Sequence, residues 1–297
     1  MSVTRVRRRL LVQIVTVAAL CAGINGCVNL DDAAGLSKLA DEARAVLPKV
    51  SSDVSGTCAR QNILFENTPA AERPKTEQAQ DCKPYQELAD HLAKDQNALI
   101  AYFDALGKLS SNQPLGYDAV INKNVTTSST NTAFSASAIT AGNDAQSLLK
   151  SLADAATAGY REKQLSRLIE ANDAVVQSLT QSLKKVITAD YTLLLSNEEL
   201  SLDTFYQGPM ASAQPNERLT LILVQRQYAN DKSALQVRKE DATSYGKVMD
   251  DLATLHAKLK LEAEKKASMV EVARQVAPVV ESLKTTLSDI QSRSNQP

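Results

Sequence analysis

The sequence predicts an all-α protein, an elongated helical bundle that contains a long antiparallel helical hairpin. Three observations support this fold class. Trp is absent, aromatic residues make up 4% of the 297 residues, and Gly and Pro number only 10 and 9. Ala, Leu, Lys, Gln, Glu and Ser dominate, which favours helices over the β-branched and aromatic runs typical of sheets. Apolar residues also recur at helical spacing over long stretches of the chain.

The amino terminus has the layout of a secretory signal. Four arginines lie among the first nine residues, and no acidic residue occurs among the first 26. Residues 10–22 follow, with only Gln13 and Thr16 polar. Such a run is too short to cross a bilayer as a helix, which takes about 20 residues. A basic segment followed by a short apolar one and small residues is typical of an export signal.

The end of this segment, INGC at residues 24–27, resembles the lipobox of bacterial lipoproteins. In that family the cysteine becomes the first residue of the mature chain and carries a diacylglycerol on its sulfur. The resemblance implies a signal peptide over residues 1–26, lipid attachment at Cys27 and a membrane-anchored envelope protein. Val28 stands where an Asp would favour inner-membrane retention, so the resemblance favours the outer membrane facing the periplasm. The inner membrane, the cell surface and an ordinary signal peptide with a chance cysteine stay open.

Two cysteines, Cys58 and Cys82, remain once Cys21 leaves with the signal and Cys27 is lipidated. An isolated pair in an oxidising compartment indicates one disulfide. A metal pair or a reactive thiol is the alternative, but C-x-x-C spacing and clustered histidines are absent from the sequence. We therefore expect a structural disulfide that closes a loop over residues 58–82.

The remaining residues, 27–297, are interpreted as a single helical domain. Of the 33 basic residues, four lie in the signal, so this domain carries 29 basic against 34 acidic residues and a net charge of −5. That balance lacks the clustered basic face of a nucleic-acid-binding protein. No second long apolar run follows the signal.

The first half of this domain shows three helical segments in order. Residues 31–50 have helical apolar spacing, and Pro48 is expected to kink or end that helix. A second helix is expected to begin near Pro84, where proline suits the first turn, and to end near residue 110. A Ser/Thr-rich connector over 122–137 then precedes a helix capped by Asn143.

The second half predicts the hairpin. Apolar spacing is sustained over 160–206, Gly208-Pro209 supplies a stop, and the pattern restarts at Pro215 and runs beyond Leu259. Each arm covers nearly 50 residues, or about 70 Å at 1.5 Å per residue. A short turn between two such arms makes them antiparallel neighbours.

A last helix is expected over 267–291, bent at Pro278. Asp190 and Asn197 fall near seam positions of the preceding arm. These polar residues argue against a simple long two-stranded coiled coil.

Four residues, Tyr191, Phe205, Tyr206 and Met210, are expected to cluster near the hairpin tip. In a chain so poor in aromatic residues, they form a candidate interaction surface. The alternative is that they pack the end of the bundle.

Titratable residues give no catalytic or cofactor motif. Glu87, His91 and Asp95 share one helical face, but this spacing more often marks a solvated face than a metal site. His256 is expected at the boundary of a helix rather than in catalysis. The mixed charges over 258–266 indicate a solvated face rather than a lipid contact. We therefore predict no catalytic residue, no metal and no cofactor.

The sequence thus predicts a non-enzymatic, membrane-anchored envelope lipoprotein that acts as a helical scaffold or protein-interaction module. Its expected partners are the membrane, through the lipid, and an envelope protein, with no nucleic acid. One alternative is a periplasmic bundle with an apolar ligand cavity. Another is an enzyme that uses dispersed carboxylates, with Glu87, Asp90 or Asp95 as nominal candidates.

Overall fold

The structure, a computed structural model, describes residues 31–68, 79–111, 135–157 and 161–295. Over these ranges every regular element is a helix and no strand occurs, which confirms the all-α prediction. In chain order the elements are α2 (Asp31–Asn67), α3 (Lys83–Ser110), α5 (Ala136–Thr157), α6 (Arg161–Lys185), the π-helix η1 (Val186–Tyr191), α7 (Thr192–Ser212), the 3-10 turn η2 (Pro215–Glu217), α8 (Arg218–Glu264) and α9 (Met269–Ser294).

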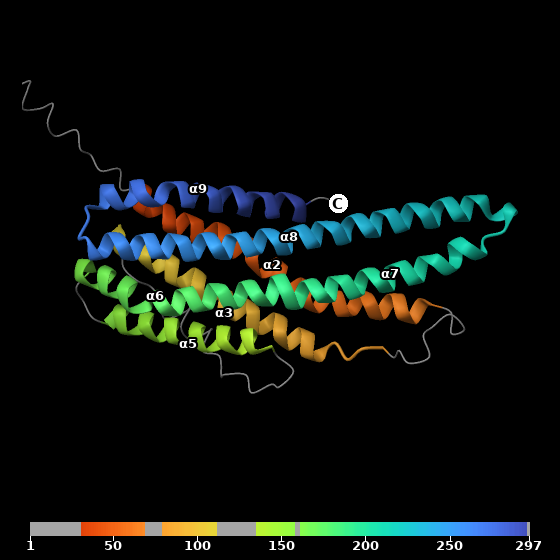
Figure 1. The fold of residues 1–297 in the computed structure, drawn as a ribbon, viewed down its shortest axis with the longest axis horizontal. Coiled ribbons are helices and arrows are strands. Elements are labelled where there is room, and N and C mark those ends of the chain that lie inside the picture. Colours follow the sequence, from red (N-terminus) through yellow and green to blue (C-terminus); the bar gives the residue numbers. More distant parts are fainter. Residues whose placement is uncertain (1–30, 69–78, 112–134, 158–160, 296–297) are drawn as a thin grey trace, which may run out of the picture.

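The helices run along one long axis, with α8 passing through the middle of the bundle (Figure 1). α8 packs against α6, α7 and α9, while α2 packs against α3, α7 and α9. One end of the bundle is formed by the start of α2 and the turn from α8 to α9. At the other end the hairpin of α7 and α8 extends beyond the remaining helices (Figure 1).

One continuous hydrophobic core joins α2, α3, α5, α6, α8 and α9. Its residues lie on the apolar stripes that helices of this length must bury against one another to be stable. The largest fully buried side chains are Tyr102, Phe103, Tyr191, Tyr245, Leu39, Leu47, Leu92, Leu99, Leu106, Leu148, Leu152 and Leu179.

α2 continues through Pro48, so of the two outcomes expected there, a kink or an end, the end is wrong. A proline inside a helix costs about 3 kcal/mol, since it removes one backbone hydrogen bond and crowds the preceding turn. Val46, Leu47 and Val50 flank it and are all buried. Burial of each such side chain contributes about 1.5–3 kcal/mol, which offsets the cost of the proline.

The disulfide between Cys58 and Cys82 is present, with 5.7 Å between the two Cα atoms, which confirms the predicted pairing. The predicted loop over 58–82 is wrong at its start, because α2 remains helical to Asn67. The bond therefore ties the second half of α2 to the residue before α3. Asn62 supports the same junction, since its side chain donates to the Gln80 carbonyl at 2.9 Å and accepts from the Gln80 N–H at 2.8 Å.

Replacing both cysteines (C58S/C82S) is expected to lower the free energy of unfolding by about 3 kcal/mol. The reason is that a cross-link over a sequence separation of 24 restricts the unfolded chain. Urea titration followed by circular dichroism measures the change. Reductant should destabilise the parent chain by the same amount and leave the double variant unchanged. Equal midpoints for parent and variant would contradict the expectation.

Two other helix boundaries differ from the sequence-based expectation. α5 begins at Ala136, well before Asn143, which lies inside the helix. α7 continues through Pro209 to Ser212. α9 spans Met269–Ser294 with Pro278 inside it, close to the predicted helix over 267–291 that includes this proline. α3 does begin at Lys83, next to Pro84, as predicted. Pro48 and Pro209 therefore did not mark the ends of their helices.

The predicted signal peptide (1–26) and Cys27 lie outside the described residues, as does all of the 122–137 connector before residue 135. None of the helices in the described ranges has the length and apolarity needed to cross a membrane.

Candidate interaction surface on the helical hairpin

The hairpin consists of α6, η1 and α7 as one arm and α8 as the other, joined through η2. Its turn is closed by a capping box. The Gln214 N–H donates to the Glu217 carboxylate at 2.8 Å, and the Gln214 side chain accepts from the Glu217 N–H. The same Glu217 N–H forms the 3-10 bond to the backbone carbonyl of Gln214 at 2.9 Å. Reciprocal pairing of this kind satisfies backbone donors at a helix start and fixes the direction in which α8 leaves the turn.

A cluster of opposite charges anchors the base of the hairpin to α2. Arg60 forms two 2.8 Å hydrogen bonds with Asp53, and its Nε donates to Glu198 at 2.7 Å. Arg238 of α8 donates to the same Glu198 oxygen at 2.5 Å. Burial alone would lower the pKa of Arg60, but the bonds to Asp53 and Glu198 raise it above its usual value. The two carboxylates and two guanidiniums therefore balance in charge while linking three helices.

The π-helix η1 places Tyr191 in this cluster. The Thr192 side-chain hydroxyl donates to the carbonyl of Ile187, five residues earlier, at 3.2 Å. Tyr191 is buried, and its hydroxyl donates to Asp53 at 2.5 Å. Burial and the neighbouring Asp53 raise the pKa of Tyr191, so it stays protonated as a donor. Gly246 lets α8 pass close by, because a Cβ there would lie 2.7 Å from the Thr188 methyl group.

Farther along the hairpin, ion pairs join α7 to α8. Lys232 contacts Glu199 at 2.7 Å and Asp203 at 3.0 Å, and Lys239 contacts Glu199 at 2.5 Å. Lys232 and then Lys239 lower the pKa of Glu199 to about 2. Tyr228 donates to Asp203 at 2.8 Å. These contacts hold the two arms of the hairpin together beyond the cluster at its base.

The residues predicted to cluster at the tip do not all come together. Tyr191 lies in the charged cluster at the base of the hairpin. Phe205 and Tyr206 do meet, with ring centroids 4.9 Å apart, and Tyr206 also contacts Tyr228 at 5.2 Å. Tyr206 is buried and its hydroxyl donates to Asp231 at 2.6 Å. Phe205 and Met210 are half-buried. The aromatic residues thus mainly pack the hairpin against itself.

The exposed apolar side chains of the tip are aliphatic and lie at the start of α8. Leu219, Ile222 and Leu223 are 71%, 50% and 58% exposed. Sequence reasoning placed Leu219 and Ile222 in the buried stripe, although the run LTLILV at 219–224 is apolar on more than one helical face. Apolar residues on more than one face of this helix were the signal in the sequence that some of them would be exposed. In the structure α8 extends beyond the core here, so part of the run faces solvent (Figure 1).

His256 is not a boundary residue as expected, because it is fully buried. Its Nε2 lies 2.7 Å from the Tyr102 hydroxyl, and its Nδ1 lies 3.1 Å from Asp173, which also pairs with Lys260. Burial lowers the pKa of His256 despite the nearby Asp173. The imidazole is therefore neutral at pH 7 and serves as a satisfied polar group of the core.

Asp95 likewise departs from the expected solvated face. It is 1% exposed, and its Oδ1 has no hydrogen-bond partner among the described residues. Burial raises its pKa to about 8, and nearby Asp144 adds to the shift. Glu87 and His91 are half-buried on the same helix. Over the described ranges, no group of three His, Cys, Asp or Glu side chains is arranged to hold a metal ion.

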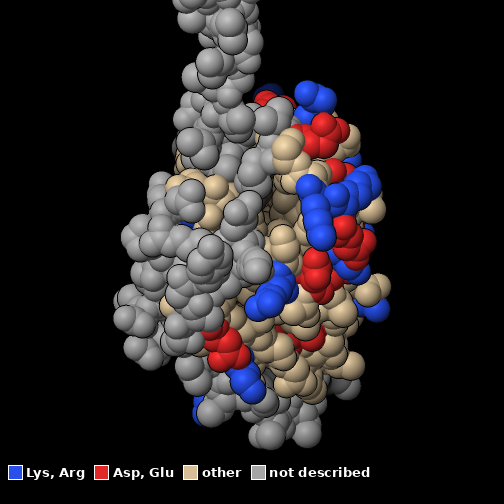
Figure 2. Space-filling model, turned by 90° about the vertical axis from the view of Figure 1, so that its left-hand side faces the viewer, with Lys and Arg blue, Asp and Glu red and all other residues tan. Residues whose placement is uncertain are grey.

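The residues at 258–266 show mixed charge, and two of their lysines are paired. Lys260 pairs with Asp173 at 3.0 Å, and Lys265 pairs with the buried Glu262 at 2.8 Å. Figure 2 views the bundle from the end where α8 passes into α9. Basic and acidic side chains are interspersed over the described part of that face.

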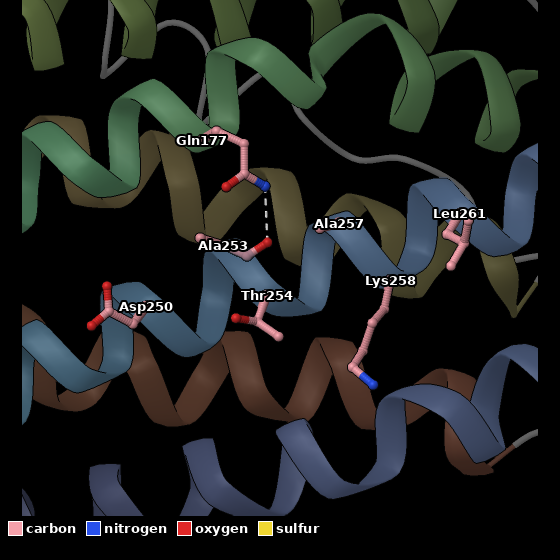
Figure 3. A pocket seen from close by; sticks show the side chains of 7 residues that line it. All are labelled: Gln177, Asp250, Ala253, Thr254, Ala257, Lys258 and Leu261. Atoms are coloured by element: carbon pink, nitrogen blue, oxygen red, sulfur yellow. Dashed lines mark hydrogen bonds between the residues drawn. The ribbon is translucent and has the colours of Figure 1, made fainter.

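An open groove of about 580 Å³ runs along the carboxyl-terminal third of α8 beside α6 (Figure 3). Three of its polar side chains are engaged within the chain: Gln177 donates to the Ala253 carbonyl at 2.9 Å, Asp250 pairs with Lys184, and Lys258 donates to the Gln275 carbonyl at 3.2 Å. An enclosed cavity suits a small ligand better than an open groove does. The lining residues are Gln177, Asp250, Ala253, Thr254, Ala257, Lys258 and Leu261.

Comparison of the chain with protein-family models, with curated proteins and with solved structures finds no match.

Proposed function

We propose that this protein is a membrane-anchored envelope lipoprotein that acts as a helical scaffold and presents an interaction surface at the tip of its hairpin. The observation that carries the proposal is the projecting hairpin with three exposed aliphatic side chains at the start of α8. Bulky apolar side chains held away from the core by a braced pair of helices cost solvation free energy unless a partner covers them.

The positions of the start of α2 and of the hairpin tip, at opposite ends of the bundle, support this role. α2 begins at Asp31, four residues after the proposed lipid-attachment residue, at the end of the bundle opposite to the hairpin tip (Figure 1). The 47 residues of α8 span about 70 Å. A lipid at Cys27 would thus leave the tip free to reach a partner far from the point of attachment, since two or three acyl chains give stable anchoring.

The two alternative functions have less support. A ligand-binding bundle calls for an enclosed apolar cavity, whereas the groove beside α8 is open and has polar residues in its lining. For an enzyme that uses dispersed carboxylates, Asp95 is the candidate with a perturbed pKa, but it does not line that groove.

Mass spectrometry of the chain purified from envelopes tests the anchor. We expect a mature amino terminus at Cys27 carrying diacylglycerol and an amide-linked acyl chain. The C27S variant should move from the detergent phase to the aqueous phase on detergent partitioning. A mature terminus at any other residue would contradict the proposal.

The scaffold role is tested by crosslinking before detergent extraction. A stoichiometric envelope partner is expected with the parent chain, and its recovery should fall at least fivefold with the I222S variant. L193S is the matched control, because Leu193 is 63% exposed but lies away from the tip. Equal recovery with both variants would show that the partner binds elsewhere.

A further inference from the structure

The outward side of the first turns of α8 combines apolar and basic side chains. At 100° per residue, Arg218, Leu219, Ile222, Leu223 and Arg226 fall within an arc of about 140°. This arc lies opposite to the direction of Leu235, the first buried residue of α8. We call these five residues the α8 tip face. It combines three aliphatic side chains with two guanidiniums.

The two arginines of the α8 tip face are available for a partner. Both are exposed, and neither forms a hydrogen bond or an ion pair within the described ranges. By contrast, Arg60 and Arg238 at the base of the hairpin are paired with Glu198. Glu217, next to Arg218, uses a carboxylate oxygen to cap η2. The face therefore offers uncompensated positive charge beside apolar surface.

The spacing of the aliphatic residues suits a helical partner. Leu219, Ile222 and Leu223 stand at i, i+3 and i+4, the spacing that forms a ridge for packing into the groove of another helix. Ala229 and Ser233 continue the same side of α8 and are also exposed. Their small side chains allow a second helix to approach closely over the following two turns.

The two arginines of the α8 tip face argue against two other occupants, a second copy of the chain and an anionic membrane. In a second copy packed antiparallel about Ile222, Arg218 of one chain would face Arg226 of the other, and a parallel pair would bring identical arginines together. Like charges in register are destabilising. An anionic membrane is recognised by clusters of about four to eight basic residues, whereas this face carries two.

We infer that the α8 tip face is a docking site for an amphipathic helix of a partner protein that carries carboxylates beside its apolar stripe. The inference rests on the proposed function in that it names the kind of partner that the tip binds. It makes the aliphatic residues the source of affinity and the two arginines the source of specificity.

A pair of synthetic helical peptides tests this directly. Both peptides are about four heptads long and have leucine at the core positions. The acidic peptide has glutamate at the positions that flank the leucines, and the basic peptide has lysine there. The full chain, solubilised in detergent, is titrated with each peptide labelled with a fluorophore, and anisotropy is recorded. We expect the acidic peptide to bind at least tenfold more tightly than its basic twin.

Charge exchange provides the decisive variant. R218E/R226E should reverse the preference, so that the basic peptide binds at least tenfold more tightly than the acidic one. I222S should weaken binding of the acidic peptide at least fivefold, while L193S should leave it unchanged. All these side chains are exposed, so thermal unfolding should match the parent and show that the fold is intact.

Several outcomes would overturn the inference. Absence of binding, or equal binding of the two peptides, would remove the acidic helix as the partner. Binding to phosphatidylglycerol vesicles that is stronger than peptide binding and is lost in R218E/R226E would assign the face to lipid. A dimer at micromolar concentration that is lost in I222S would assign it to a second copy. Peptide binding does not depend on lipid at Cys27, so failure of the anchor and failure of this inference give different results.

Discussion

Asp95→Asn is expected to raise the free energy of unfolding at pH 8 by an amount on the order of 5 kcal/mol and to have little effect near pH 4. Asp95 is buried on α3, and burial raises its pKa from 3.8 to about 8. Each unit of difference between the folded and unfolded pKa corresponds to about 1.4 kcal/mol.

The direction of this pH dependence follows from the number of protons that the folded and unfolded states bind. Between about pH 4 and pH 8 the unfolded chain has lost the Asp95 proton while the folded chain retains it. The unfolded state then binds fewer protons, so the free energy of unfolding falls as pH rises through this window and levels off above it. An uncharged amide at residue 95 removes this contribution, and the profile of the variant should be flatter.

Urea unfolding at pH 4.5, 6, 7 and 8.5 measures the difference between the variant and the parent. Asp90→Asn is the matched control, because Asp90 lies on the exposed side of the same helix. D90N should follow the pH profile of the parent. If D95N followed it as well, Asp95 would be ionised in the folded chain and the proposed burial of a neutral carboxyl would be wrong.

Glu198→Ala is expected to lower the free energy of unfolding by about 3 kcal/mol. The Glu198 side chain is 5% exposed and accepts from both Arg60 and Arg238. Removing it leaves two guanidiniums with Asp53 as their single carboxylate in a partly buried site. Loss of one partner from a buried group of charges costs far more than loss of an exposed pair.

Chemical denaturation at pH 7 measures this change, and Asp41→Ala provides the control. Asp41 forms an exposed ion pair with Arg44 on α2, and such pairs contribute about 0–1 kcal/mol. Hydrogen exchange should also show faster opening of α7 in E198A, because the cluster joins that helix to α2. Equal midpoints for E198A and D41A would mean that the cluster does not brace the hairpin.

The hairpin, its turn and the disulfide could be predicted from the sequence because each depends on local or countable features. Sustained apolar spacing with a short Pro-marked turn defined the two arms, and two remaining cysteines left one intramolecular pairing. The continuation of helix α2 past Pro48 could not be predicted in this way. It depends on the packing of Val46, Leu47 and Val50 in the core, which local propensity does not encode.

The buried polar residues were misassigned for a similar reason. His256 has ordinary helical neighbours in sequence, and its partner Tyr102 lies 154 residues away. The aliphatic residues of the tip present the opposite case. Leu219 and Ile222 continue a stripe that is buried farther along α8, and only the length of α8 beyond the other helices exposes them. Sequence spacing identifies a helical face but not the residue at which the neighbouring helices end.

The π-helix at Val186–Tyr191 has a consequence for tolerance to insertions and deletions. A π-turn accommodates additional residues relative to regular helical winding. Deleting one residue from this segment is expected to restore regular winding and to keep the rotation of α7 relative to α6. Deleting one residue from a regular turn of α6 would instead rotate α7 by about 100°. Glu198, Glu199 and Asp203 would then turn away from their lysine and arginine partners on α8. The π-helix is therefore a place in this arm where loss of one residue is expected to be tolerated, whereas the regular turns of α6 fix the pairing with α8.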